Sequence, residues 1–264
     1  MTEPGPRPSP SPLPATAARP GPSGAAAGAW SVEIDDGPTG EFHERDPGPD
    51  PGHRLWVRRP LRPALVIGST QPDALIRHDR AEAAGIEVCR RRSGGGLVYL
   101  DPRTDCWIDA VVPAGSPLWE DDVGLAFLWL GRRWASVLDG FLGPAGPALL
   151  HRPRSAVRRG RPLWCFGEVG HGEVTIGGSK VVGLSQRRTR HWLRLQSLVL
   201  GAWPGRRLLD YLDLDAVPGA TGTDPGAVAA GPPAGLRLPS PAELARRFVD
   251  GLPDPARIAA SEGP

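Results

Sequence analysis

Three glycine-rich stretches of the sequence hold the residue types that could do chemistry. The first, residues 89–101, reads CRRRSGGGLVYLD and sets three successive glycines beside three arginines. Glycine lets a backbone approach a ligand closely, and free N–H groups can surround an anion or a carbonyl oxygen. Arginine adds planar, permanently charged donors for phosphate or carboxylate. The stretch predicts an anion or acyl site, with a flexible turn between two strands as the alternative.

The second stretch, residues 173–186, reads EVTIGGSKVVGLSQ and contains Lys180, the only lysine beside thirty arginines. Such a bias is typical of a GC-rich genome, in which arginine replaces lysine wherever either serves. Lysine differs as a compact charge on a flexible stem, able to sit between a phosphate and a carbonyl oxygen. Its glycine neighbours predict a strand beside a closely approached backbone. We interpret Lys180 as catalytic, with a solvated surface lysine as the alternative.

The third stretch, residues 162–174, reads PLWCFGEVGHGEV and places Cys165 fifteen residues before Lys180. A thiol activated by a nearby cation is a nucleophile. A cysteine between Trp164 and Phe166 is more often a small buried hydrophobe, and composition alone favours that interpretation. We assign no base role to His171, a loop histidine flanked by glycines.

Composition limits the class of protein. The chain has 264 residues, 40% of them hydrophobic, which is enough for a core. Its 31 basic and 29 acidic residues nearly balance, so nothing points to nucleic acid or a membrane surface as a partner. Three cysteines without a CxxC pair indicate reduced thiols and no zinc site. With no signal peptide and no apolar span, we expect a cytoplasmic protein.

Proline and glycine divide the chain into segments. Twelve of the first 51 residues are proline, and we expect residues 1–28 to form a disordered tail. A catalytic domain is expected over 29–216, a Pro/Gly/Ala linker over 217–236, and a C-terminal helix and tail over 237–264. Within the domain, residues 37–52 read as a proline-rich loop.

The predicted elements mix strands and helices without regular alternation, which favours an α+β fold with a mixed sheet packed against helices. In the helix expected over 119–142, apolar residues from Val123 to Phe141 share one face and should be core. The other predicted helices are 73–84, 206–212 and 240–251. The predicted strands are 30–34, 53–59, 64–68, 86–90, 97–100, 106–112, 173–184 and 191–200.

Three segments in order, ALVIGSTQ, RRRSGGGLVYLD and CFGEVGHGEVTIGGSKVVGLSQRR, resemble the motifs of the lipoate-protein ligase A and octanoyltransferase family, which is related to biotin protein ligase. The agreement extends from residue 53 to about 200. It implies the biotin/lipoate protein ligase catalytic-domain fold. It also implies transfer of a lipoyl or octanoyl group to a lysine of a lipoyl carrier domain, in a 2-oxoacid dehydrogenase or a glycine cleavage H protein. In the ligases the acid is first joined to AMP from ATP, with Mg²⁺.

The resemblance also implies roles for individual residues. Lys180 would act on the acyl carbonyl and phosphate, and no protein metal ligand is expected. The residues expected to bind the acyl-adenylate are Gln71, Arg90, Arg91, Ser93, Gly94, Gly95, Gly96, Gly178 and Gly183.

Two alternatives to an ATP-dependent ligase stay open. In an ATP-independent transferase, Cys165 would carry the acyl group as a thioester taken from acyl carrier protein, without ATP or metal. A catalytically reduced paralogue would only bind, as the departures from the family pattern suggest. These are Arg103-Thr104 for a glycine-asparagine pair, Gln196-Ser197 for a histidine-glycine pair, and the loop 37–52 for an early helix with an acidic residue. We also expect no accessory domain in the segment after residue 200.

One further segment, residues 151–163, is basic and contains Arg158 and Arg159. Because it lacks interleaved aromatic residues, it indicates a solvated loop or a docking surface for an acidic carrier domain, and no nucleic-acid site.

Overall fold

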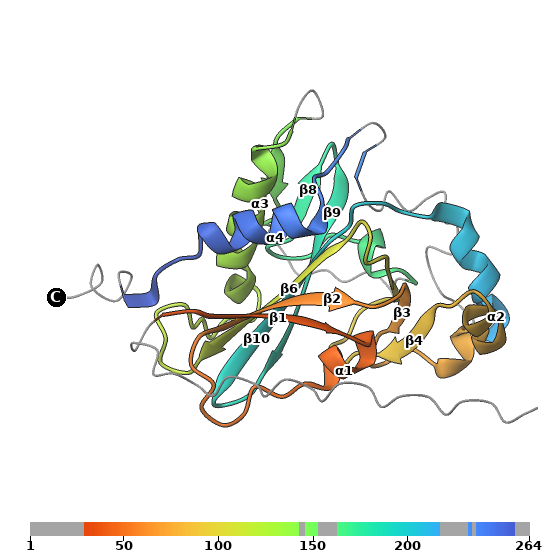
Figure 1. The fold of residues 1–264 in the computed structure, drawn as a ribbon, viewed down its shortest axis with the longest axis horizontal. Helices are drawn as coiled ribbons and strands as arrows, with labels where there is room; N and C mark the ends of the chain where they lie inside the picture. The colour runs from red at the N-terminus through yellow and green to blue at the C-terminus, as the bar shows by residue number, and fades with distance from the viewer. Residues whose placement is uncertain (1–28, 143–145, 153–162, 217–231, 234–235, 257–264) are drawn as a thin grey trace, which may run out of the picture.

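The computed structural model describes residues 29–142, 146–152, 163–216, 232–233 and 236–256 (Figure 1). The described strands form a seven-stranded sheet in the order β1-β2-β6-β10-β9-β8-β7 and a three-stranded sheet in the order β4-β3-β5. Both sheets mix parallel and antiparallel pairs. The predicted α+β class with mixed sheets is therefore confirmed. The expected tail 1–28 and most of the expected linker lie outside the described residues.

The bounds of the elements are as follows. The large sheet contains β1 (Ser31–Gly37), β2 (Arg54–Pro60), β6 (Cys106–Pro113), β7 (Ala148–Leu150), β8 (Val174–Ile176), β9 (Ser179–Arg188) and β10 (Trp192–Val199). The small sheet contains β3 (Ala64–Ile67), β4 (Glu87–Arg90) and β5 (Val98–Leu100). The helices are α1 (Thr39–Glu44), α2 (His78–Ala83), α3 (Leu128–Asp139) and α4 (Pro241–Asp250), with 3-10 turns η1 (Asp73–Leu75), η2 (Leu125–Phe127), η3 (Cys165–Gly167), η4 (Gly205–Tyr211) and η5 (Leu214–Ala216).

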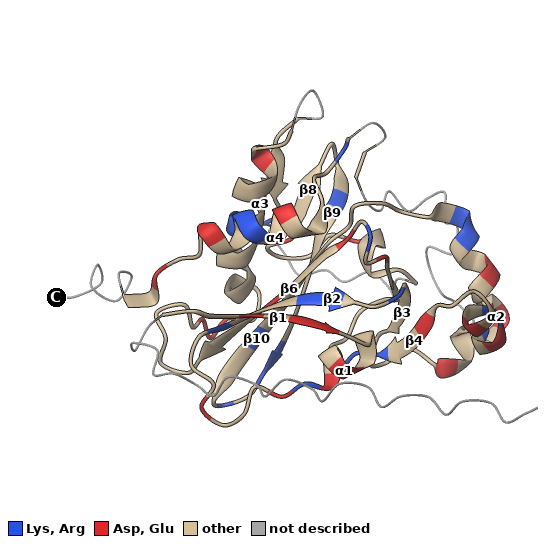
Figure 2. Ribbon diagram, viewed as in Figure 1, with Lys and Arg blue, Asp and Glu red and all other residues tan. Residues whose placement is uncertain are grey.

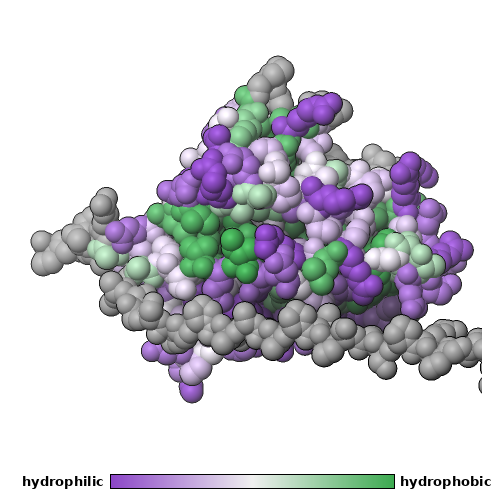
Figure 3. Space-filling model, in the orientation of Figure 1, coloured by the Kyte–Doolittle hydropathy of each residue, from purple (hydrophilic) through white to green (hydrophobic). Residues whose placement is uncertain are grey.

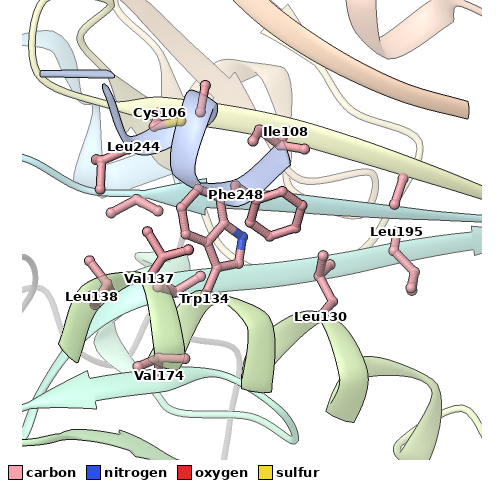
Figure 4. Close-up of a cluster of buried hydrophobic side chains, with 14 of the residues drawn as sticks. Cys106, Ile108, Leu130, Trp134, Val137, Leu138, Val174, Leu195, Leu244 and Phe248 are labelled. Atoms are coloured by element: carbon pink, nitrogen blue, oxygen red, sulfur yellow. The ribbon is translucent and has the colours of Figure 1, made fainter. Parts of the chain in front are cut away.

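Helices α3 and α4 cover one face of the large sheet and form the main core. Trp134 of α3 packs against Phe248 of α4 with ring centroids 4.5 Å apart, and strand residues such as Ile108 and Leu195 close the cluster (Figure 4). Helix α4 begins at a Ser240 cap, whose hydroxyl accepts the N–H of Glu243 at 3.3 Å, and the proline that follows suits the first turn. None of the described helices is long and apolar enough to cross a membrane.

The opposite face of the large sheet lies under α1 and the small sheet. Phe42 of α1 and Leu100 of β5 pack against Trp107 of β6 in a separate buried cluster. The register places Trp107, Leu198 and Gly183 side by side across three strands, followed two residues on by Asp109, Gln196 and Ser185. Because side chains alternate along a strand, both rows project from this face. Figure 1 shows α3 and α4 together, well separated from the small sheet and α2.

Several predicted elements were wrong in extent. The predicted helix 73–84 is divided into η1 and α2, and α3 begins only at Leu128, which leaves Val123 58% exposed. The predicted strand 173–184 is a hairpin, because Gly177 and Gly178 turn the chain at φ 56° and 81°. Positive φ values of this kind favour glycine.

The prediction of a loop over 37–52 was also wrong, because this segment contains α1. The backbone N–H groups of Thr39 and Gly40 donate to the carboxylate of Glu87 at 3.0 and 2.7 Å. Phe42 is buried on the opposite side of the turn. A distant carboxylate thus satisfies the free N–H groups at the start of a helix that its own sequence does not favour.

A buried charge cluster fixes α1 over the sheet. Asp109 accepts bonds from the Arg194 guanidinium at 2.5 and 3.1 Å and from the Trp107 indole N–H at 2.7 Å. Arg194 also donates to the carbonyls of Phe42 and Arg45 in and after α1, at 2.6 and 2.8 Å. Burial alone would raise the pKa of Asp109, but the adjacent arginines outweigh it and lower that pKa.

The edge of the sheet carries charge pairs of a different kind. Acidic β1 lies beside basic β2 (Figure 2), and Arg59 of β2 donates to Asp36 of β1 at 2.6 Å with both side chains more than half exposed. Exposed pairs such as Arg59–Asp36 contribute little to stability.

Figure 3 shows a group of hydrophobic residues beneath α4 on the same view, surrounded by hydrophilic ones.

These two kinds of ion pair should respond differently to mutation. We expect Arg194→Leu to lower the free energy of unfolding by roughly 3–5 kcal/mol, because Asp109 then stays buried without the guanidinium that donates most of its hydrogen bonds. The matched control Arg59→Leu should change it by less than about 0.5 kcal/mol. Denaturant unfolding measures both, and equal losses would contradict the assignment of Asp109 and Arg194 as a structural pair.

Candidate functional site

The predicted glycine loop, residues 93–96, packs directly on the turn after β3. A Cβ placed on Gly68 would lie 1.9 Å from the carbonyl oxygen of Gly95, so only glycine fits there. The Ser69 N–H donates to the carbonyl of Ser93 at 3.1 Å, and Gly95 has φ 102°. The IGSTQ and SGGG motifs thus form one backbone unit.

The two predicted arginines organise this unit. Arg91 is buried and donates to the carbonyls of Gly94 and Gly96, the latter at 2.6 Å. Arg90 donates to the carbonyls of Gly68 and Gln71 at 2.9 and 2.6 Å. Both guanidinium groups therefore shape the loop backbone, and their contact with a ligand stays a prediction.

Two predicted polar side chains lie at the same unit. The amide of Gln71 accepts from the Gly68 N–H at 3.0 Å and donates to the carbonyl of Leu163 at 3.1 Å, joining the turn to the strand-like segment before η3. The hydroxyl of Ser93 is buried, and no described residue hydrogen-bonds to it. Ser93 does not line the pocket, and its contact with a ligand stays a prediction.

Cys165 lies at the start of η3, next to the glycine loop. Its N–H donates to the carbonyl of Leu97 at 2.9 Å, and its sulfur lies 3.8 Å from a Cβ built on Gly95. Trp164 and Phe166 on either side are buried, whereas Cys165 is partly exposed and lines a pocket. The thiol is therefore not a fully buried hydrophobe.

Lys180 is buried, which excludes the solvated surface lysine. Its ammonium donates to the carbonyls of Cys165 at 2.8 Å and Glu168 at 3.0 Å, and pairs with the Glu173 carboxylate at 2.7 Å. It also lies 5.0 Å from the centre of the Phe166 ring. Three acceptors around one ammonium match the three N–H bonds of lysine and would not suit a planar guanidinium.

Glu173 is the residue that the sequence reasoning missed at this point. Its carboxylate is buried and also accepts the N–H groups of Gly170 and Leu184, at 2.6 and 3.0 Å. A buried lysine needs a carboxylate partner, and Glu173 is the acidic residue nearest to β8 in the same motif. That requirement was the signal available in the sequence.

A pocket of about 60 Å³ opens beside these residues, between the large sheet and the small one. Cys165, Phe166, Arg91 and Gly183 line it near Lys180, and side chains of β3, β5, β6, β9 and β10 form the rest of its wall. A Cβ on Gly183 would lie 2.7 Å from the Phe166 ring, so the absence of a side chain at this position leaves room for the ring.

The other predicted residues divide between the site and its surroundings. Gly178 lies in the β8–β9 turn and does not line the pocket. Arg103 is exposed and pairs with Asp101, while Ser197 donates to the carbonyl of Ile108 at 2.8 Å. Gln196 and Ser197 both line the pocket. The basic residues Arg158 and Arg159 lie outside the described residues.

His43 of α1 is a second residue that the sequence reasoning missed, because α1 was predicted as a loop. It is buried, lines the pocket, and lies on Trp107 with ring centroids 4.8 Å apart. Burial lowers the pKa of His43 to about 3; Asp109 opposes the shift and nearby arginines add to it. The imidazole in the pocket is therefore neutral near pH 7.

Comparison with known proteins identifies the fold that carries this geometry. Residues 42–108 match the family model of the lipoyl protein ligase A/B catalytic domain. A structure of lipoate-protein ligase A bound with ATP aligns with a TM-score of 0.59 at 15% identity, over 89% of this chain and 94% of that one. The chain has the fold of the lipoate-protein ligase catalytic domain. The resemblance noted in the three motifs is thereby confirmed.

A second solved structure with the lipoate-protein ligase fold supports the same assignment. Protein Ta0514 from T. acidophilum with bound lipoic acid aligns with a TM-score of 0.54 at 14% identity, covering 80% of each chain. No curated protein matches the chain in sequence. Within the described part of the chain, no group of three or more His, Cys, Asp or Glu side chains could hold a metal ion.

The contact between the two motif loops of this fold can be tested by a pair of glycine substitutions. We expect Gly68→Ala to displace the glycine loop and to lower the free energy of unfolding by roughly 1–3 kcal/mol, because its Cβ would collide with backbone. Gly94→Ala is the control, since a Cβ there meets nothing within 4 Å. Chemical denaturation compares them, and a tolerated Gly68→Ala would contradict the described approach of the two loops.

The burial of His43 predicts a pH dependence of stability. Its pKa is about 3 when folded and near 6.5 when exposed, so unfolding takes up a proton between these values. The contribution of neutral His43 to the free energy of unfolding is therefore complete above pH 6.5. It is lost as the pH falls toward 3, at up to about 1.4 kcal/mol per pH unit. We expect His43→Gln to remove this part of the slope, and exposed His191→Gln to keep it. Unfolding at a series of pH values measures both, and equal slopes would refute the burial of a neutral His43.

Proposed function

We propose that the chain is a protein lipoylation enzyme of the lipoate-protein ligase type. It would join a lipoyl or octanoyl group, through an acyl-adenylate, to a lysine of a lipoyl carrier domain. The observation that carries the proposal is the buried Lys180 ammonium, which donates to the Cys165 carbonyl and lies on the Phe166 ring, two residues that line the pocket. The shared fold of structures containing lipoic acid and ATP supports it.

The proposed chemistry has two steps. The carboxylate of the acid attacks the α-phosphate of ATP, which releases pyrophosphate and forms the acyl-adenylate. The carrier lysine amine then attacks the acyl carbonyl, and AMP leaves. Both steps place negative charge on phosphate and carbonyl oxygens, which a lysine ammonium and glycine-loop N–H groups would stabilise.

The Lys180 ammonium can move away from Glu173 without leaving that carboxylate unpaired. When the ammonium turns toward an incoming anion, the Glu173 carboxylate keeps two backbone N–H donors, from Gly170 and Leu184. It is therefore not left without partners, which would be costly for a buried carboxylate. We infer that Glu173 holds Lys180 in the resting state, and that substrate takes over its charge.

The partners of the proposed reaction follow from the same chemistry. The acceptor would be the lipoyl carrier domain of a 2-oxoacid dehydrogenase or a glycine cleavage H protein. Mg²⁺ would arrive with ATP, because it binds oxygen ligands and is commonly held by substrate phosphates with few protein groups.

A second candidate function rests on Cys165. Its partly exposed thiol lines the pocket, and its carbonyl accepts from Lys180, so an acyl thioester at Cys165 would lie beside the ammonium. In this ATP-independent transferase, the thiolate attacks the thioester of acyl carrier protein and displaces the carrier thiol. The amine of the lipoyl domain then attacks the Cys165 thioester and releases the thiol.

Mass spectrometry of the full chain separates these functions. With ATP, Mg²⁺ and lipoate or octanoate, we expect an acyl-adenylate, formed by Cys165→Ser at a rate close to that of the original chain. Lys180→Arg should lose most of the rate, about 100-fold or more, because three converging acceptors fit an ammonium and not a planar guanidinium. Far-UV circular dichroism checks that each variant folds.

Three other outcomes would contradict the ligase or the role given to Lys180. Acyl attached to Cys165 from acyl carrier protein without ATP, and lost in Cys165→Ser, would establish the transferase instead. Retention of activity in Lys180→Arg would contradict the role of the ammonium. Neither adenylate nor thioester, with retained binding of the acid, would indicate a chain that only binds.

A further inference from the structure

Most of the pocket wall is apolar, but polar side chains line it as well. The apolar part comes from Val66, Val98, Leu100, Trp107, Phe166, Leu184 and Leu198. Of the polar side chains, Arg91 and Ser197 donate to the carbonyls of Gly96 and Ile108, and the others are His43, Ser185 and Gln196. Polar groups are unfavourable in a wall that binds only a hydrocarbon chain, because an apolar ligand leaves them without hydrogen bonds.

Gln196 has an unfilled hydrogen-bonding capacity. The Nε2 atom of its amide is buried, and no described residue accepts a hydrogen bond from it. Its one contact is Oε1, which accepts from the Ser185 hydroxyl at a long 3.4 Å. Exchanging the nitrogen and oxygen of the amide only moves the unpaired position to the other atom. A buried unpaired amide in a pocket indicates a partner that arrives with the ligand.

His43 is a second polar group in this wall. Its ring lies on Trp107, with ring centroids 4.8 Å apart. The charged groups around it are Asp109, Arg194 and Arg58, which are paired with one another, and Arg91, which donates to the glycine-loop carbonyls. A neutral imidazole offers one donor and one acceptor, so it can bind a hydroxyl, carbonyl or amide of a ligand.

The strand register places these groups away from the reacting end. Gly183, which lies against Phe166, shares a row with Leu198, and the next row along the strands holds Ser185 and Gln196. The Lys180 ammonium lies 5.0 Å from the Phe166 ring, and that ring lies against Gly183, one row before Ser185 and Gln196. An acid whose carboxylate lies at Lys180 therefore meets Gln196 with the distal part of its chain.

We propose that the acyl group taken by this site carries a hydrogen-bonding oxygen or nitrogen on the distal part of its chain, which Gln196 and His43 receive. The inference rests on the proposed function and narrows its substrate to polar-tailed acids. A purely hydrocarbon acid would bury the Gln196 amide unpaired and bind more weakly, by about tenfold or more.

The test compares matched acids on the full chain. Hexanoate is set against 6-hydroxyhexanoate and octanoate against 8-hydroxyoctanoate, with lipoate as a further substrate. Binding is measured by calorimetry, and acyl-adenylate or thioester formation by mass spectrometry with ATP or with the acid on acyl carrier protein. The original chain should favour a hydroxy acid of one pair by about tenfold or more.

Two variants connect the preference to the residue. Gln196→Leu should abolish or reverse it, while Gln186→Leu, whose amide donates to the Val123 carbonyl outside the pocket, should keep it. Removing an unpaired buried amide should not lower the melting temperature. If Gln196→Leu fails to fold, the preference of the original chain decides by itself.

The outcomes separate this inference from the proposed function. Equal or better use of the hydrocarbon acids, unchanged in Gln196→Leu, would overturn the inference and leave the lipoylation enzyme standing. Failure of every acid to bind or react would overturn both.

Discussion

The buried negative charge of Asp109 is the constraint on which the pocket depends. It lies in the middle of the large sheet, fully buried, where an unpaired carboxylate would be prohibitive. Arg194 on the next strand supplies the main neutralising charge, and its remaining N–H groups bind carbonyls of α1 and the residue after it. The pairing of one strand residue with another therefore also fixes α1. Because His43 lies on α1, the same pairing also positions His43 in the wall of the pocket.

Lys180 and Glu173 form a second buried charge pair, which the proposed reaction places at the reacting end. Arg194 is held by planar, multiple bonds that suit a permanent structural charge. The Lys180 ammonium sits on a flexible stem among three acceptors, one of which keeps other donors when the lysine moves. In the proposed reaction, arginine thus supplies the fixed charges and the one lysine supplies the charge that changes partners.

How much of this could be predicted from the sequence depended on the range of the interactions. The strands on either side of the SGGG loop and the buried core of α3 were predictable, because local spacing and glycine content determine them. Helix α1 was not, because the carboxylate that caps it, Glu87, lies 47 residues beyond Gly40. The hairpin at Gly177 was missed for another reason: a tight turn between two apolar strands has the same alternation as one strand.

The site residues followed the same rule. Lys180 and Cys165 were predicted to be close from their motifs, and a hydrogen bond joins them. Glu173 required the knowledge that Lys180 is buried, which spacing does not give. His43 required α1 itself. A residue whose role depends on a contact between distant segments leaves no periodic signal in its own neighbourhood.

The departures from the family pattern are not spread evenly over this site. Gln196 replaces a motif position and lines the pocket, and the segment that differs most, residues 37–52, contributes His43 to the same wall. By contrast, the glycine loop, Lys180 and their backbone contacts keep the motif residues and a tightly fitted geometry. Arg103, the remaining departure considered, is exposed and pairs with its neighbour Asp101. Under the proposed function, changes concentrated on this pocket wall, beside a glycine loop and a lysine that keep the motif residues, would alter which acid is accepted while keeping the reaction.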